Sequence, residues 1–246
     1  MVQVPAATAD PILQVYLLGA VDFDDMLRCQ RRLVYEASGD RSRAVLILCE
    51  HAPLISVGRE GSRDHIDFEP HELAARQWPV RWVNRGGGCL LHLPGQLAVY
   101  PILALDRLGL DLRGYLDRLH SVLVDVVTKM EVPAVVRPGQ PGVWANGRLL
   151  AHVGVAVREW VTYFGAGLNV HPDLGPFRQV AVAGPGEPPM TSLVREHHEP
   201  VRDAAVRQRL VEVFAKRFGF ARTSLFHTHP ALTRSAPSDA VASGSR

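Results

Sequence analysis

Residues 84–101, NRGGGCLLHLPGQLAVYP, bring together the side chains of this sequence that are best suited to bind or to react. Glycines 86–88 have no Cβ atom, so their backbone can come very close to a ligand. Arg85 offers five N–H donors in a fixed fork, and His92 offers a nitrogen that can titrate. The Pro-Gly turn after His92 predicts a hairpin that lines a pocket. The alternative is a structural hairpin with a glycine bulge and a buried histidine.

The same stretch does not match a nucleotide-binding motif, because neither the GxGxxG spacing nor a GK[ST] sequence is present. The histidines at positions 197, 198, 227 and 229 have no cysteine or carboxylate at metal-ligand spacing. We therefore predict no metal site and no cofactor. The 27 lysines and arginines nearly balance the 25 aspartates and glutamates, which gives no electrostatic support for a nucleic-acid or anionic-membrane partner.

The cysteines and the N-terminus bear on the compartment. Cys29, Cys49 and Cys89 are an odd number, are widely spaced and form no CxxC pair, a pattern typical of a reducing compartment. The first residues lack the charged and apolar regions of a signal peptide, and no apolar run approaches the roughly 20 residues that a membrane helix needs. We expect a cytoplasmic protein.

The elements that must position the hairpin are a mixture of strands and separate helices. A helix capped by Asp22 is expected over residues 23–37, and strong 3.6-residue periodicity predicts another over 112–130. A last helix covers about 202–218. HAPLISVGR, residues 51–59, is interpreted as a loop. Strands are expected over residues 12–18, 44–50, 79–84, 97–105, 132–136, 142–144, 148–157 and 161–168.

This mixture predicts an α+β fold in which a mixed sheet is flanked by helices. We expect one domain over residues 12–226, preceded by a loose arm over residues 1–11. Residues 227–246 are rich in Ser, Ala and Pro, a composition that predicts a disordered tail.

RGGGCLLHLPGQLAVYPI, residues 85–102, resembles the motif RGGxxTxHGPGQLVxYPI of the lipoyl(octanoyl) transferases. The resemblance spans about residues 12–220 and implies the single-domain catalytic fold that biotin and lipoate protein ligases share. Its further segments lie in family order. They are EHAPLISVGR at 50–59 (similar to EHxxVYTxGR), GVW at 142–144, AHVGVAVR at 151–158, GLNVHPDLGPF at 167–177 and TSL at 191–193.

The family moves an octanoyl group from acyl carrier protein to a lysine of a lipoyl domain. The resemblance therefore implies an octanoyltransferase-like protein of lipoate biosynthesis, with those two partners. It also implies that the glycine hairpin wraps the acyl chain while two later segments complete the pocket wall. The implied substrate-binding residues are Arg85, Gly86, Gly87, Gly88, Cys89, Leu90, Leu91, His92, His152, Val153, Gly154, Gly165, Ala166 and Gly167.

The family's chemistry uses a cysteine thiolate, which takes the octanoyl group, and a lysine that lowers the pKa of that cysteine. The cysteine position is Ala183 in this sequence, and the lysine position is Leu149. The family's covalent route is therefore not available. Arg148 is adjacent, but neighbouring residues of a strand face opposite sides. A His-Gly pair before the last pocket segment has become Phe164-Gly165.

These departures leave three hypotheses. In the first, octanoyl transfer follows a changed route, either by direct attack of the acceptor lysine on the bound thioester or with Cys89 as a relocated nucleophile. Pairing Cys89 with His92 needs a bulge, because residues i and i+3 of a regular strand face opposite sides. In the second, the protein is a non-catalytic pseudoenzyme or binding subunit that retains the acyl pocket. In the third, the protein is a lipoate or biotin ligase, although such ligases usually have a lysine at the position of Leu149. The acyl chain length, the acceptor protein and the oligomeric state stay open.

Overall fold

The computed structural model describes residues 12–181, 189–197 and 200–232. Its helices are α1 (Phe23–Gly39), α2 (Pro70–Arg76), α3 (Leu112–Thr128), α4 (Leu193–Glu196) and α5 (Asp203–Phe218), with 3-10 turns at Arg63–His65 and Pro176–Gln179. Its strands are β1 (Ile12–Ala20), β2 (Ala44–Glu50), β3 (Leu54–Val57), β4 (Val80–Trp82), β5 (Cys89–His92), β6 (Gln96–Leu103), β7 (Val135–Arg137), β8 (Gln140–Ala145), β9 (Arg148–Arg158), β10 (Val161–Asn169) and β11 (Arg222–Phe226).

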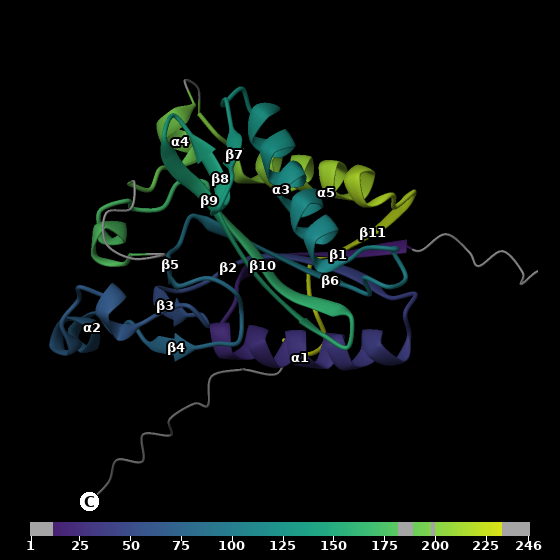
Figure 1. Cartoon of the computed structure of the whole chain (residues 1–246), viewed down its shortest axis with the longest axis horizontal. Coiled ribbons are helices and arrows are strands. Elements are labelled where there is room, and N and C mark those ends of the chain that lie inside the picture. Colours follow the sequence, from purple (N-terminus) through teal and green to yellow (C-terminus); the bar gives the residue numbers. More distant parts are fainter. Residues whose placement is uncertain (1–11, 182–188, 198–199, 233–246) are drawn as a thin grey trace, which may run out of the picture.

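Eight strands form a large sheet in the order β11-β1-β2-β6-β10-β9-β8-β7, and a small sheet has the order β4-β3-β5 (Figure 1). β1 runs parallel to both of its neighbours, β11 and β2. From β2 to β7 the large sheet is antiparallel. The predicted α+β fold with a mixed sheet flanked by helices is confirmed.

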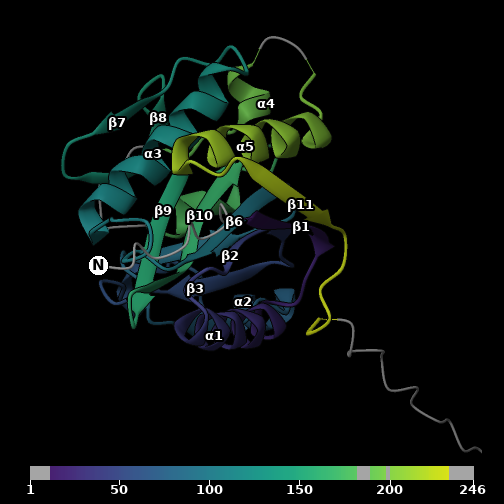
Figure 2. The same ribbon diagram turned by 90° about the vertical axis from the view of Figure 1, so that its right-hand side faces the viewer.

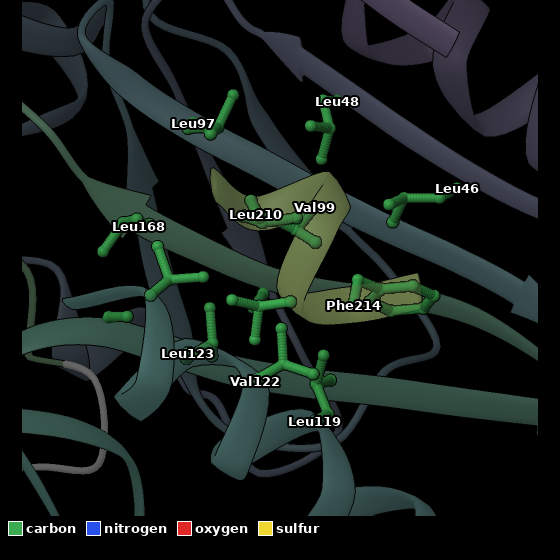
Figure 3. Close-up of a cluster of buried hydrophobic side chains, with 14 of the residues drawn as sticks. Leu46, Leu48, Leu97, Val99, Leu119, Val122, Leu123, Leu168, Leu210 and Phe214 are labelled. Atoms are coloured by element: carbon green, nitrogen blue, oxygen red, sulfur yellow. The ribbon is translucent and has the colours of Figure 1, made fainter. Parts of the chain in front are cut away.

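The helices cover both faces of the large sheet. α3 and α5 lie on one face and α1 lies on the other, as two views at right angles show (Figures 1 and 2). Under α3 and α5, Leu119, Leu123 and Phe214 are fully buried against strand side chains such as Val99 (Figure 3). Burying each such side chain stabilises the fold by about 1.5–3 kcal/mol. This face is therefore closed, and the opposite face carries the candidate site.

α1 begins where the sequence predicts. The side chain of Asp22 accepts a hydrogen bond from the backbone N–H of Asp25 at 2.9 Å, which satisfies one of the unpaired donors at the helix start. Met26 and Leu33 are buried on the face toward the sheet. Cys29 is buried there too, and burial raises the pKa of its thiol to about 11, as suits a packing residue.

The interpretation of residues 51–59 as a loop is wrong at its centre. Pro53 and Gly58 flank this stretch and resemble loop boundaries, but the four residues between them form β3. All four are buried, and the strand pairs with β4 on one side and with β5 on the other. The strand has only four residues, three of them apolar, so it is too short to show the repeated alternation that reveals longer strands.

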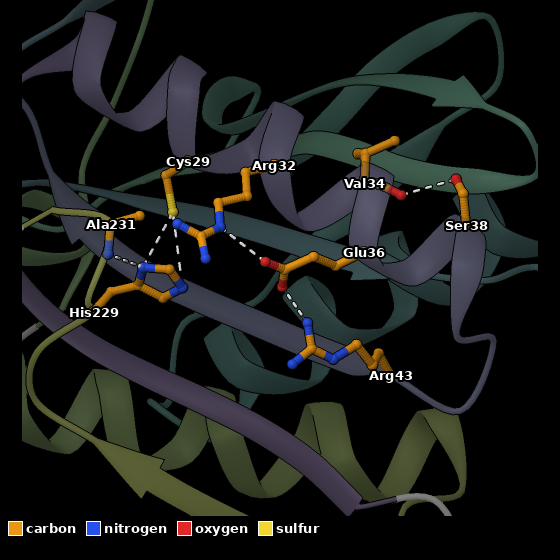
Figure 4. Close-up of polar contacts among 8 residues, drawn as sticks. All are labelled: Cys29, Arg32, Val34, Glu36, Ser38, Arg43, His229 and Ala231. Atoms are coloured by element: carbon orange, nitrogen blue, oxygen red, sulfur yellow. Dashed lines mark hydrogen bonds and ion pairs between the residues drawn. The ribbon is translucent and has the colours of Figure 1, made fainter.

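The C-terminal part of the fold extends beyond the predicted boundary at Phe226. β11 pairs with β1, and the chain then brings His229 under α1, where its Nδ1 lies 3.5 Å from the Sγ of Cys29 (Figure 4). His229 is buried, and its ring packs edge-on against Tyr16. Residues 227–232 therefore belong to the folded domain rather than to a tail. Residues 233–246, like the arm over residues 1–11, lie outside the described part of the chain.

Candidate functional site

The candidate site is a small pocket, here called the inner pocket, between the two sheets and the first turn of α1. The small sheet contributes Leu90 and His92, and α1 contributes Phe23. The large sheet contributes Ala98 and Tyr100 of β6, His152 and Gly154 of β9, and residues 164–167 of β10; Ser56 and Arg85 complete the lining. Segments far apart in the sequence thus meet on the face of the large sheet that α3 and α5 leave open.

Arg85 is buried in the wall of this pocket, with an exposed fraction of 3%. One Nη2 group donates to the carbonyl and to the Oγ of Ser56, both at 2.8 Å, and Nη1 donates to the Gly86 carbonyl at 3.0 Å. Burial lowers the pKa of Arg85 to about 10, so the guanidinium still carries its charge at neutral pH. It forms no ion pair with any residue in the described ranges.

The predicted hairpin is wrong, because β5 pairs with β3 in the small sheet whereas β6 pairs with β2 and β10 in the large sheet. Glycines from three segments make room for Arg85. A Cβ at Gly58 would lie 2.7 Å from Arg85 Nη1, and a Cβ at Gly154 would lie 3.3 Å from Arg85 Cδ and 2.9 Å from the Gly86 carbonyl oxygen. Gly87 adopts φ +78°, a conformation that favours glycine. Its missing Cβ faces open space, with Arg85 Nη1 the nearest atom at 3.7 Å. The glycines therefore mainly allow neighbouring segments of the protein to pack closely around Arg85.

His92 lines the pocket and is held there by Ser56. Its Nε2 lies 2.8 Å from Ser56 Oγ, and its Nδ1 is buried without a hydrogen-bond partner among the described residues. Because Ser56 Oγ accepts from Arg85, its own hydrogen is available for Nε2, which places the proton of the neutral imidazole on Nδ1. Burial, with His51, His152 and Arg85 nearby, lowers the pKa of His92 well below its usual value.

His152 faces the same pocket from β9. A Cβ at Gly167, its partner on β10, would lie only 2.2 Å from the Cε1 of this ring, so the glycine is what allows the imidazole to fit. Burial lowers the pKa of His152 to about 3, so the ring is neutral. Its Nδ1 has no hydrogen-bond partner within the described ranges. The ring centres of His92 and His152 are 6.1 Å apart.

Sequence reasoning missed His51 and Tyr100, which support this histidine pair, and Ser56, which orients His92. His51 Nδ1 donates to the Val21 carbonyl at 2.7 Å, so its Nε2 accepts from the Tyr100 hydroxyl at 2.9 Å. Burial lowers the pKa of His51 to about 4. The signal was present in EHAPLISVGR, which contains both His51 and Ser56. The loop interpretation of that segment hid the fact that β3 lines the pocket.

The structure brings most of the implied binding residues together and separates three from the pocket. Leu90 and His92 line it, whereas Cys89 and Leu91 alternate to the other face of β5 and pack in the core of the small sheet. Val153 points from β9 into the core beneath α3 and α5. The implied residues at the pocket or in the loop beside it are Arg85, Gly86, Gly87, Gly88, Leu90, His92, His152, Gly154, Gly165, Ala166 and Gly167.

Cys89 is poorly placed to act as a relocated nucleophile. Its thiol donates to the Ser62 carbonyl at 3.3 Å, on the face of β5 opposite His92. Burial raises the pKa of this thiol, although the hydrogen bond to Ser62 opposes the shift. A thiol that stays protonated and points away from the pocket cannot supply the thiolate that such chemistry needs.

In the resembled family, the positions of Leu149 and Ala183 carry the chemistry. Only Leu149 lies among the described residues. Leu149 is buried on β9, and its backbone is paired through the carbonyl to Thr191. Arg148 is occupied elsewhere, because its Nε and Nη2 donate to Glu196 Oε1 at 2.9 and 2.6 Å. Ala183 lies outside the described residues.

Residues 22–215 match the family model described as the lipoyl protein ligase A/B catalytic domain. An octanoyltransferase of Geotalea uraniireducens (strain Rf4) is 38% identical over 78% of this chain and 87% of its own length. An octanoyltransferase of Geobacter sp. (strain M21) is 41% identical over 73% of this chain and 84% of its own. None of these matches favours the non-catalytic alternative.

Solved structures agree on the fold. A lipoate-protein ligase A bound with ATP superposes with a TM-score of 0.70 at 15% identity, covering 88% of each chain. A bipartite lipoate protein ligase of Thermoplasma acidophilum gives a TM-score of 0.64 at 16% identity, over 88% of this chain and 87% of that one. Among the described residues, no helix is long and apolar enough to cross a membrane, and no group of three ligands could hold a metal ion.

Proposed function

Because this chain belongs to the octanoyltransferase family, within the lipoyl protein ligase A/B catalytic domains, we propose that it carries out octanoyl transfer in lipoate biosynthesis. The donor is an octanoyl thioester of acyl carrier protein, and the acceptor is the lysine amine of a lipoyl domain. The three cysteines form no disulfide, which suits action in a reducing compartment such as the cytoplasm.

One observation carries this proposal. Two neutral imidazoles, His92 and His152, each leave a buried Nδ1 without a partner in the described part of the chain, beside a pocket with an otherwise largely apolar wall. Leaving a buried polar atom unpaired costs about 1–3 kcal/mol. A site that retains two such atoms is prepared for a ligand that has one polar group and an apolar remainder, as an octanoyl thioester has.

The acyl chain and its carbonyl then have separate environments. Burying eight carbons at about 0.8 kcal/mol per methylene contributes roughly 6 kcal/mol before ordering costs. The carbonyl oxygen lies at the histidine end, where His92 Nδ1–H donates to it. Arg85 is a positioning residue, because it holds Ser56, and Ser56 in turn fixes the tautomer of His92.

The reaction is direct aminolysis. The neutral amine of the acceptor lysine attacks the thioester carbonyl carbon and forms a C–N bond, while the carbonyl oxygen becomes an oxyanion hydrogen-bonded by His92. The intermediate collapses, the C–S bond breaks, and the carrier thiolate leaves with the proton released by the amine. Alignment and oxyanion stabilisation supply the rate without a covalent enzyme intermediate.

The test is intact-mass spectrometry of an apo lipoyl domain after incubation with octanoyl-acyl carrier protein and this protein. We expect octanoylation of the lipoyl domain, with no octanoyl adduct on the protein itself. His92→Phe, which removes the donor to the oxyanion, should lower the rate about a hundredfold. His171→Gln, a change at an exposed histidine outside the pocket, is the control and should leave it unchanged. Absence of transfer by the unmodified protein would overturn the proposed function.

A further inference from the structure

A second cavity, here called the outer groove, lies beside α1 and has a volume of about 220 Å³. It is enclosed by α1, by the end of β4 and by the ends of β9 and β10 nearest the turn that joins them (Figure 1). A cavity of roughly 150 Å³ is large enough to hold benzene. The outer groove therefore has room for one aromatic ring with a short substituent.

The floor of the outer groove is buried, whereas its rim is exposed. Gln30, Val34 and Phe164 form the floor and are buried. Arg31 and Arg158 lie at the rim and are exposed. A ligand in this groove would therefore place its apolar part inward and a charged group outward.

Three aromatic side chains, those of Trp82, Tyr163 and Phe164, line the outer groove. Consecutive residues of a regular strand face opposite sides, but Phe164 adopts φ +56° and its ring lies 5.2 Å from that of Tyr163. This left-handed backbone is costly for a bulky residue, and such strain is found mostly at functional sites. Trp82 is 66% exposed and contacts no other aromatic ring among the described residues, so its face can pack against a ligand.

The two arginines at the rim lack a counter-charge. Neither Arg31 nor Arg158 forms an ion pair within the described part of the chain. No described aspartate or glutamate lines the groove, and Asp24, the carboxylate that Arg31 influences, is already bound by Arg81. Two guanidinium groups beside an apolar groove favour a ligand that carries a carboxylate.

The buried amide of Gln30 adds a polar group at the floor. Its Oε1 accepts a hydrogen bond from the backbone N–H of Phe164 at 2.7 Å, whereas its Nε2 has no hydrogen-bond partner among the described residues. A buried donor that stays unpaired is unfavourable. The floor therefore favours a ligand with an acceptor atom at its inner end, such as a hydroxyl group on the ring.

We propose that the outer groove is a binding site for a small aromatic carboxylate. The ring lies against Trp82, Tyr163 and Phe164, and the carboxylate accepts hydrogen bonds from Arg31 and Arg158. This inference goes beyond octanoyl transfer and does not rest on it, because the ligand occupies the outer groove and not the inner pocket.

The experiment is fluorine NMR of the full chain with its four tryptophans replaced by fluorotryptophan, during titration with para-hydroxyphenylacetate. The Trp82 resonance, identified by its absence from the Trp82→Phe variant, should shift and saturate. The Trp160 resonance should stay unchanged, because Trp160 is exposed but does not line the groove. A Trp82 resonance that shows no saturable shift overturns the inference.

Two further compounds test which parts of the ligand are recognised. Para-hydroxyphenylacetamide has the same shape without the charge and should bind about tenfold more weakly than the acid. Acetate has the charge without the ring and should produce no saturable shift of the Trp82 resonance. Equal binding of the acid and the amide, or saturable binding of acetate with the affinity of the acid, would contradict the assigned ligand class.

Arginine variants test the rim. Arg31→Gln and Arg158→Gln should each weaken binding of para-hydroxyphenylacetate about tenfold, because each removes a charge-assisted hydrogen bond. Arg28→Gln, one turn before Arg31 on α1 and outside the groove, is the matched control and should leave the affinity unchanged. Equal weakening by Arg28→Gln and Arg31→Gln would indicate general attraction to a basic surface and would overturn the proposed site.

Discussion

At the scale of single residues, the ion pair with Glu196 fixes the position of the Arg148 side chain. This carboxylate accepts from Arg148, from Asn146 and from the Thr191 hydroxyl. Burial opposes its ionisation, but these hydrogen bonds outweigh burial and lower its pKa. Arg148 therefore balances a buried charge and is not a substitute for an ammonium at position 149.

This arrangement leads to a prediction about restoring the family's covalent chemistry. Ala183→Cys together with Leu149→Lys should produce a protein that becomes octanoylated at position 183 by octanoyl-acyl carrier protein, scored by intact mass. Neither single change should suffice, since a lone cysteine keeps a pKa near 8.5 and a lone lysine has no thiol to activate. Because Leu149 is buried, Leu149→Lys alone should also lower the free energy of unfolding.

The singles serve as controls for the double variant. Self-acylation of the Ala183→Cys variant without the lysine would mean that another group already lowers the pKa of a thiol at this position. No acylation of a folded double variant would mean that residues 149 and 183 do not lie close enough together to form the pair.

The residues of the pocket could be predicted from the sequence only in part. Arg85, His92 and His152 stand in segments whose glycines and histidines are unusual enough to be noticed. Tyr100 gave no such signal, because a tyrosine within an apolar strand is most often a packing residue, and Ser56 stands in a segment that was interpreted as a loop. Their role depends on pairing between segments, which a single sequence does not reveal. The opposite facing of Cys89 and His92 was predictable, because it follows from strand geometry alone.

At the scale of elements, β10 is shaped by its glycines. A Cβ at Gly167 would lie 2.2 Å from the His152 ring, and a Cβ at Gly165 would lie 2.1 Å from the Val99 carbonyl oxygen on β6. The first neighbour is a side chain and the second is backbone. The two positions therefore serve different purposes, one for the pocket and one for the close pairing of β10 with β6.

We predict that the two glycines respond differently to alanine. Gly167→Ala should displace His152 and weaken octanoyl-thioester binding at least tenfold, with a loss of about 1–3 kcal/mol in the free energy of unfolding. Gly165→Ala should be the more destabilising change, because backbone cannot rotate away. Calorimetry and urea unfolding measure the two effects.

Gly39→Ala is the matched control for both variants. This glycine lies at the end of α1 with no atom within 4 Å of the position of a Cβ, so alanine there should be neutral or slightly stabilising. Unchanged octanoyl-thioester binding by Gly167→Ala would contradict the placing of His152 in the binding site.

The elements themselves were predictable where the pattern was long. α1, α3 and α5 are amphipathic over four or more turns, and each lies where periodicity predicted it. β3 and β11 were missed because both are short. β11 is mostly exposed and carries little apolar pattern, and its pairing with β1 is a contact between the two ends of the sequence.

For the molecule as a whole, the buried histidines couple stability to pH. Burial lowers the pKa of His51 to about 4 and of His152 to about 3. Between these values and the ordinary value near 6.5, the unfolded chain binds protons that the folded protein does not. The stability that they contribute is therefore complete above about pH 6.5 and is lost as the pH falls.

We predict a steep decrease in the urea midpoint as the pH falls from about 6.5 to 5. Each of these histidines should cost about 1.4 kcal/mol per pH unit within that window. His51→Gln should make the decrease shallower, and His71→Gln, at an exposed residue of α2, should not. A midpoint that stays constant down to pH 5 would mean that the histidines are not buried as neutral rings.

The pairing of β1 with β11 also has a consequence for how the chain is made. Ile12 lies beside Arg222 in the completed sheet, so β1 is synthesised long before its partner β11. At about 5–20 residues per second, that delay is about 10–40 s. During it, one edge of β1 exposes unpaired backbone donors and acceptors, which can pair with other chains. We therefore expect the nascent chain of this protein to need a chaperone that covers the open edge of β1 during synthesis.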